Sequence, residues 1–191
     1  MKKLNRAIII ISRIIEVFMW VGAALSAVLT GLGAAGKFSA MRFFASVTPQ
    51  TPVLDAGYGF SLVALDAAGQ PMRAAYVLFF LTLVLTFALM AMCARNVHLI
   101  FKTSEAKTWF SKGETPFQPD NIRMVREIGI FLIAIPVVQL IMSIVARIVL
   151  GPDTVESSLN TVNLFTGLVM LALSQYFAYG MQLEQDVDGL V

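Results

Sequence analysis

The sequence predicts an all-α transmembrane protein, a four-helix membrane bundle with a small extracytoplasmic cap between helices 1 and 2 and a cytoplasmic amphipathic helix between helices 2 and 3. Three observations lead to this prediction. Hydrophobic residues make up 58% of the 191 positions and charged residues only 14%, whereas soluble domains are roughly half apolar and a quarter charged. Four apolar stretches are long enough to cross about 30 Å of hydrocarbon, which takes about 20 helical residues. Basic residues gather on alternate connections between these stretches.

The four apolar stretches divide the chain into alternating spans and connections. A backbone in lipid must satisfy its own N–H and C=O groups, and the sequence lacks the repeated alternation of a barrel strand, so each stretch is expected to be a helix. We therefore predict a single membrane domain over residues 1–191. Its spans are 7–33, 74–94, 128–150 and 161–180, separated by an outer segment 34–73, an inner loop 95–127 and an outer loop 151–160, and followed by an inner tail 181–191.

The distribution of basic residues predicts the orientation. Cytoplasmic connections carry an excess of Lys and Arg close to the spans. The residues that set this excess are Lys2, Lys3 and Arg6 before the first span and Arg95, Lys102, Lys107, Lys112, Arg123 and Arg126 in the inner loop, against Lys37, Arg42, Arg73 and Arg147 elsewhere. Both termini are therefore expected in the cytoplasm. The first stretch also resembles a cleaved signal peptide, but Arg13 and Glu16 interrupt it and its length suits a span better.

The outer segment is long enough to carry structure of its own. Residues 37–46 place apolar side chains at helical spacing, which is typical of a short helix in the membrane interface. Residues 58–64 alternate between large and small or polar side chains, which predicts one strand. Two interpretations stay open, a ligand-sensing cap over the outer mouth of the bundle and a loop folded back to cover the helix ends.

The inner loop carries the most detailed pattern. Residues 96–110 have apolar and basic side chains at the spacing of an amphipathic helix on a membrane surface. Pro119 is well placed as the first residue of the next helix, where its missing N–H costs nothing. The loop is either a basic region that fixes the topology or a docking surface for a partner.

Ionisable and small residues in the first span suggest helix contacts. Arg13 and Glu16 are three positions apart and can form a polar pair on one helix face. Small residues on neighbouring stripes allow close helix packing; they are Gly22, Ala23, Ser26, Ala27, Thr30 and Gly31. Polar residues of the later spans are expected to hydrogen-bond between helices; they are Gln139, Ser143, Asn163, Ser174 and Gln175. Glu16 is interpreted as half of a structural pair or, alternatively, as a transport site.

Motifs of known enzyme classes are scarce. His98 is the only histidine and Cys93 the only cysteine, so neither a histidine cluster nor a cysteine metal site can form. The sequence has no phosphate-binding loop and no nucleophile-elbow motif. The acidic tail could hold Mg²⁺ weakly, but it is interpreted as a solvated chain end, because sites for hard cations need more converging oxygens. We therefore expect no catalytic residue, no metal and no cofactor.

Two stretches resemble a known family. Gly113-Glu-Thr-Pro-Phe117, followed by Asn121, Arg123, Arg126 and Ile128-Gly129, is similar to a conserved stretch of a bacterial four-helix inner-membrane family catalogued as domain of unknown function 2975. The ending 180–191 resembles that family's terminal segment, although Thr115 is an extra residue and Asp188-Gly189 departs from the usual pair. The resemblance implies a bacterial inner (plasma) membrane protein without established catalytic activity. It also implies a gene neighbour that encodes a small helix-turn-helix regulator.

Three functional hypotheses follow. The first is a regulatory protein whose cytoplasmic surface binds such a regulator; the candidate residues are Pro116, Phe117, Asn121, Arg123, Arg126, Glu184 and Asp186. The second is a small transporter or channel subunit that forms homo-oligomers through the small-residue faces of the first span. The third is an enzyme acting on membrane lipid, with Asp120, Asn121 and the tail as the polar groups at the interface. The net charge of +2 argues against direct nucleic-acid binding.

Overall fold

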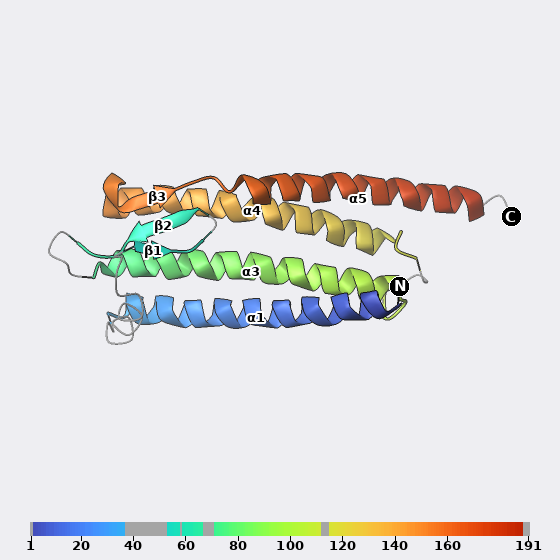
Figure 1. Cartoon of the computed structure of the whole chain (residues 1–191), viewed down its shortest axis with the longest axis horizontal. Coiled ribbons are helices and arrows are strands. Elements are labelled where there is room, and N and C mark those ends of the chain that lie inside the picture. The colour runs from blue at the N-terminus through green and yellow to red at the C-terminus, as the bar shows by residue number, and fades with distance from the viewer. Residues whose placement is uncertain (1, 37–52, 58, 67–70, 112–114, 189–191) are drawn as a thin grey trace. The chain divides into compact units, whose positions relative to one another are not determined.

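Four long helices dominate the described part of the chain. The computed structural model describes residues 2–36, 53–57, 59–66, 71–111 and 115–188. Within these ranges the long helices are α1 (Lys2–Ala34), α3 (Arg73–Ser104), α4 (Pro119–Leu150) and α5 (Thr161–Asp188) (Figure 1). All four are long and apolar enough to cross a membrane. The predicted helical class with four possible membrane spans is therefore confirmed, and α4 begins at Pro119 as expected.

The helices are longer than the predicted spans. The shortest has 28 residues and the longest 33, which corresponds to about 42–50 Å at 1.5 Å per residue. A hydrocarbon core of about 30 Å cannot contain helices of this length unless they tilt strongly. Each helix is therefore expected to extend beyond the hydrophobic layer.

The chain divides into two compact units, and the three helices α1, α3 and α4 contribute to both. Unit 1 consists of Met1–Met19, Leu89–Ala134 and Val162–Val191, and unit 2 of Trp20–Ala88 and Ile135–Thr161. Unit 1 contains the first part of α1, the last part of α3, the first part of α4, the connection between α3 and α4, and nearly all of α5. Unit 2 contains the remaining parts of α1, α3 and α4 together with a small antiparallel sheet.

The sheet of unit 2 joins strands from two connections. Its order is β1 (Val53–Asp55), β2 (Phe60–Val63) and β3 (Val155–Ser157), and β3 follows a short 3₁₀ helix, η1 (Pro152–Thr154). The paired positions of the three strands include Leu54, Leu62 and Val155 in one row and Asp55, Ser61 and Glu156 in the next. Since side chains alternate along a strand, the first row faces the core and the second faces away from it.

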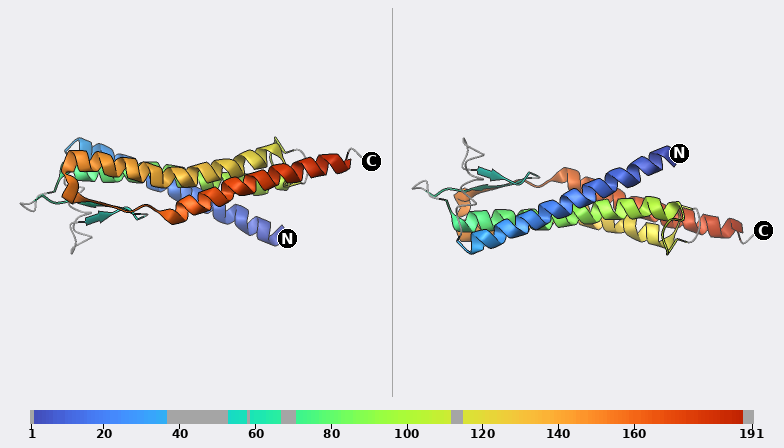
Figure 2. Two further views of the ribbon diagram at one scale, coloured as in Figure 1. Left: turned by 90° about the horizontal axis from the view of Figure 1, so that it is seen from above. Right: turned by 90° about the horizontal axis from the view of Figure 1, so that it is seen from below.

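The core of unit 2 lies between the sheet and the helices. It is formed by large apolar side chains of both, namely Leu29, Phe60, Leu62, Ala64, Tyr76, Phe79, Phe80, Met142, Ala146 and Val155. The strands accordingly lie beside α3 and α4 in Figures 1 and 2. Burial of alternate residues in β2 confirms the strand that the sequence predicted around residues 58–64. The expected interfacial helix at 37–46 lies outside the described residues, and the position of the sheet outside the membrane stays a prediction.

The connection between α3 and α4 differs from the expected amphipathic helix. Residues 96–104 complete α3 itself, and residues 105–111 form turns. The N–H of Lys107 bonds the carbonyl of Lys102 at 2.9 Å, the N–H of Ala106 bonds that of Thr103 at 3.0 Å, and Ala106 has a φ of 53°. These two bonds around a left-handed residue form a Schellman motif, which ends a helix.

In unit 1 the antiparallel helices α4 and α5 approach closely at two glycines. A Cβ atom on Gly129 would lie 2.8 Å from the carbonyl oxygen of Gly167, and a Cβ on Gly167 would lie 2.6 Å from Ile133 Cγ1. Figures 1 and 2 both show α5 beside the first half of α4. Only residues without a side chain permit this approach, which is a common device for packing helices in membranes.

A candidate binding groove beside α5

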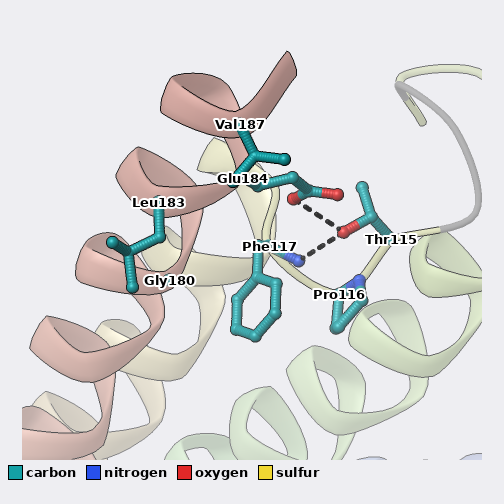
Figure 3. A pocket seen from close by; sticks show the side chains of 7 residues that line it. All are labelled: Thr115, Pro116, Phe117, Gly180, Leu183, Glu184 and Val187. Atoms are coloured by element: carbon teal, nitrogen blue, oxygen red, sulfur yellow. Dashed lines mark hydrogen bonds between the residues drawn. The ribbon is translucent and has the colours of Figure 1, made fainter. Parts of the chain in front are cut away.

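A groove in unit 1 lies between residues 115–117 and the last turns of α5. Its volume is about 610 Å³, and Figure 3 shows the side chains that line it. They are Thr115, Pro116, Phe117, Gly180, Leu183, Glu184 and Val187. Apolar atoms make up most of the lining, and Glu184 contributes the carboxylate.

Two buried amides hold residues 115–117 in place. Gln118 donates from Nε2 to the carbonyl of Thr115 at 2.8 Å, and Asn121 donates from Nδ2 to the carbonyl of Pro116 at 3.0 Å. Both side chains are buried. Asn121 also donates to the Ser104 hydroxyl at 3.1 Å, which ties the segment to the end of α3. Residues 115–117 belong to no helix or strand, yet they are held in one conformation. Two of their carbonyls accept hydrogen bonds from buried side-chain amides instead of from water.

Gly180 provides the space that Phe117 occupies. A Cβ on Gly180 would lie 2.7 Å from Phe117 Cε1, so the ring packs directly against the helix backbone. The ring also contacts Phe177 with a centroid distance of 5.7 Å. Phe117 nevertheless keeps 36% of its surface exposed. One part of the ring is fixed by α5, and the other part is available as a wall of the groove.

Glu184 gives the groove a charged end. The Thr115 hydroxyl donates to Glu184 Oε2 at 3.0 Å and accepts a bond from the backbone N–H of Phe117 at 3.2 Å (Figure 3). Leu183 and Val187 lie on the same face of α5, and both are more than half exposed. The arrangement fits a ligand that has an apolar group and a hydrogen-bond donor or positive charge next to it.

The structure brings only part of the predicted partner surface to the groove. Pro116, Phe117 and Glu184 line it. Asn121 is buried and positions the segment instead. Arg123 and Arg126 are exposed on α4 but do not line the groove, and Arg123 pairs with Glu127 at 3.4 Å. Asp186 is exposed on α5 and also lies outside the lining.

Sequence reasoning missed four of the lining residues as groove residues. In the sequence, Thr115 stands out only as a departure from the family pattern. Gly180 lies at the expected end of the last span, and Leu183 and Val187 lie in the expected tail. Their spacing along α5 is the signal that could have found them, because residues three or four apart share a helix face. The expectation that the last helix ends near residue 180 hid this signal, whereas α5 continues to Asp188.

The predicted polar pair in α1 forms an ion pair. Arg13 Nη1 lies 2.8 Å from Glu16 Oε2, with Glu16 buried and Arg13 mostly exposed. Nearby in unit 1, the His98 ring contacts the carbonyl of Ile9 through Nδ1 at 3.0 Å. Within the described ranges no group of three His, Cys, Asp or Glu residues could hold a metal ion.

The small residues of α1 separate into a packed face and an open face. Gly22 approaches Phe87, with a Cβ position 3.2 Å from the ring, and Ala23 and Ser26 are buried. Ala27 and Gly31 are exposed, and a Cβ on Gly31 would meet nothing within 4 Å. The predicted packing role therefore applies to the first three positions within unit 2.

Two polar residues of α4 and α5 form hydrogen bonds within their own helices, whereas bonds between helices were expected. Ser143 and Ser174 are buried and donate to carbonyls of their own helices, Leu140 at 2.8 Å and Leu171 at 2.6 Å. Gln175 is exposed. Gln139 is buried and belongs to unit 2. Hydroxyl groups in a helix can always reach a carbonyl three or four residues back, which makes the local bond the default.

Comparison with known proteins gives no match to a family model, to a curated protein or to a solved structure. The resemblance to the four-helix inner-membrane family therefore stays a prediction.

Proposed function

We propose that this chain is a non-catalytic membrane protein that binds a cytoplasmic partner protein in the groove beside α5. The observation that carries the proposal is the groove itself, with its apolar wall of Phe117, Leu183 and Val187 and the carboxylate of Glu184 at one end. Proteins often recognise an amphipathic helix in this way, by apolar side chains at helical spacing together with a charged contact. A partner segment with an apolar side chain and a neighbouring Lys or Arg is complementary to these features.

The lining residues support binding rather than catalysis. Among them only Glu184 is ionisable, and its partner in the structure is the Thr115 hydroxyl. The Thr115 hydroxyl and the Glu184 carboxylate lie within mutual reach, as a nucleophile and a base would. The same hydroxyl also accepts the backbone N–H of Phe117, so we assign the pair a role in holding residues 115–117. The groove offers shape and one charge, which suffice for recognition.

The partner class rests on topology and resemblance. The excess of basic residues in the inner loop supports a cytoplasmic location for the groove, by the positive-inside rule. The resemblance of residues 113–129 adds a small helix-turn-helix regulator as the candidate partner. In this proposal the membrane protein holds the regulator at the membrane and does not itself contact nucleic acid.

The proposal can be tested by site-specific photo-cross-linking in native membranes. A photoreactive side chain at Leu183 points into the groove, whereas one at Gln185 is exposed on the opposite face of the same helix and lies outside the lining. We expect a cross-linked protein of defined mass from position 183 and not from position 185. The Glu184→Lys variant is expected to weaken this cross-link strongly, because a partner cation would then face a like charge.

Two outcomes would contradict the proposal. One is equal cross-linking from positions 183 and 185, which would indicate contact with bulk membrane components. The other is a cross-link that persists unchanged in Glu184→Lys while the variant is inserted and folded normally. Mass spectrometry of the cross-linked product identifies the partner and separates a protein from a lipid.

A further inference from the structure

The sheet of unit 2 packs against helix segments that belong to the predicted membrane spans. The core that it shares with the helices includes Tyr76, Phe79 and Phe80 of the span 74–94 and Met142 and Ala146 of the span 128–150. Ser157 of β3 also lines a cavity of about 50 Å³ together with Pro136 and Gln139 of α4. Position 139 is the midpoint of the span 128–150. The sheet therefore lies beside α4 from the outer end of this span to its middle.

At the same level, the helices present large apolar side chains to their surroundings. Ile144 and Ile148 of α4 are 51% and 79% exposed, although each is only two residues from Ala146 of the core. Val28 of α1 is likewise exposed beside Leu29 of the core. Apolar surface of this kind is stable against hydrocarbon, whereas in water its exposure costs free energy. We therefore expect these segments of α1 and α4 inside the bilayer.

The face of the sheet that points away from the core has the opposite character. This polar face consists of Asp55, Ser61 and Glu156, and both carboxylates are exposed. The three residues line a groove of about 440 Å³, and most of the lining atoms are polar. Arg147 of α4 adds an exposed charge at the edge of the sheet, where its Nη2 lies 3.4 Å from Ser157 Oγ.

The backbone of the sheet also has polar groups at its edges. Within the described residues, β1 and β3 are the two edge strands. One side of each presents N–H and C=O groups that no neighbouring strand pairs. Hydrocarbon does not accommodate such groups: sheet edges and irregular backbone occur at membrane depth only where protein buries them or where they line a water-filled cavity. Charged side chains at this depth face the same restriction.

From the apolar helix surface and the polar face of the sheet at one level, we propose that the polar face lines a water-filled cavity within the thickness of the bilayer. The cavity opens to the outer side, because its strands belong to the two connections that the basic residues predict outside. It admits water and small polar solutes to near the middle of the membrane. The predicted cap thus lies partly within the membrane. This cavity is independent of the groove beside α5.

Two other arrangements agree less well with the exposed side chains. A sheet entirely outside the bilayer would leave Ile144 and Ile148 in water, at the level of Ala146. A sheet covered by a second copy of the chain would bring Asp55 and Glu156 into a dry interface, where unpaired charges are costly. A cavity leaves the isoleucines in lipid and the carboxylates in water.

Site-directed spin labelling of the full-length protein in nanodiscs tests the cavity. Nitroxides are attached to Ser61→Cys and Glu156→Cys on the sheet and to Ile144→Cys and Ile148→Cys on α4, each with the buried Cys93 replaced by Ala. Collisions with a polar nickel complex report water, and collisions with oxygen report hydrocarbon. We expect the ratio of nickel to oxygen collisions to be at least about fivefold higher at both sheet positions than at both helix positions, since hydrocarbon excludes polar groups.

The matched control is Asp153→Cys in η1, an exposed position after the end of the span 128–150, which should show the high ratio of a site in water. Thermal unfolding verifies that each labelled variant is folded. A ratio at Ile144→Cys and Ile148→Cys as high as that at Asp153→Cys would overturn the proposal, because the whole level would then lie outside the bilayer. A low ratio at both Ser61→Cys and Glu156→Cys in folded protein would also overturn it, because lipid or protein would then cover the sheet.

Discussion

The hydroxyl of Thr115 donates a hydrogen bond to Glu184 across 69 positions of sequence, with a distance of 3.0 Å. The same hydroxyl accepts the N–H of Phe117. One side chain thus fixes the charged end of the groove beside α5 and the backbone of the residue that forms its wall. The groove is preorganised by this bond, and preorganisation lowers the cost of binding a partner.

Replacement of Thr115 by Val should therefore make residues 115–117 less rigid without creating a cavity. Valine keeps the shape and loses both hydrogen bonds, so we expect a decrease of about 1–2 kcal/mol in unfolding free energy and faster exchange of the Phe117 amide hydrogen. Hydrogen exchange with mass spectrometry checks the second effect. Thr166→Val, an exposed position of α5 outside the groove, is the matched control. Unchanged exchange at Phe117 in Thr115→Val would show that the hydroxyl does not hold the segment.

The two close glycines of α4 and α5 give a prediction with an internal control. Gly129→Ala places a methyl group 2.8 Å from the Gly167 carbonyl oxygen and 2.9 Å from Leu171 Cγ. The helices must then separate, and we expect a loss of about 1–3 kcal/mol. Gly31→Ala meets nothing within 4 Å, so it should gain up to about 1 kcal/mol from helix propensity. Thermal unfolding in detergent compares the two substitutions, and equal signs would contradict the close approach.

The helices could be predicted from sequence because their signal is local. An apolar run of about 20 residues has few alternatives in a membrane, and Pro119 marks the start of α4 by its own chemistry. The sheet was only partly predictable. The alternation in β2 is visible, whereas β1 and β3 have only three residues each. Strand β1 pairs with β2 as a short hairpin, and β3 gains its strand conformation from pairing across a long sequence distance, as between Ser61 and Glu156.

The groove beside α5 was likewise only partly predictable from the sequence. Pro116 and Phe117 were singled out by resemblance, and Glu184 by its charge. Leu183 and Val187 were missed because the last helix was expected to end near Gly180, and an apolar residue in a tail carries no signal. The end of α3 was also misplaced, since a Schellman motif is usually marked by Gly and this one has Ala106 in the left-handed position.

Ala106 itself therefore gives a stabilising substitution. A non-glycine residue with a φ of 53° carries strain of about 1–2 kcal/mol that glycine does not. We expect Ala106→Gly to raise the unfolding free energy by about 0.5–1 kcal/mol, after allowance for the greater freedom of glycine in the unfolded chain. Ala172→Gly, in the exposed interior of α5, should have the opposite sign and lower stability by about 1 kcal/mol. A loss of stability in Ala106→Gly would rule out the left-handed conformation.

Glu105, just after the end of α3, predicts a pH-dependent contact with the start of α1. Its hydrogen bond with Lys107 is the main cause that holds the pKa of its carboxyl below the ordinary value, and a bond with Asn5 and the charges of Lys107 and Arg6 act in the same direction. A carboxyl whose folded pKa is lowered stabilises the fold fully above its unfolded pKa and loses this contribution as the pH falls through the folded value. Acidification should thus release the first turn of α1 from the end of α3.

An NMR titration of the Glu105 carboxyl carbon measures this pKa directly. Lys107→Met should raise it most, because that variant removes both a hydrogen bond and a charge, and Asn5→Ala should raise it less, because only a bond is lost. Lys102→Met removes an equal charge that is not bonded to Glu105 and serves as the control. If Lys107→Met and Lys102→Met shifted the pKa equally, general charge rather than the Glu105–Lys107 bond would set it. The contact between α1 and the end of α3 would then respond to salt, since interactions between exposed charges are screened within about 10 Å at 0.1 M ionic strength.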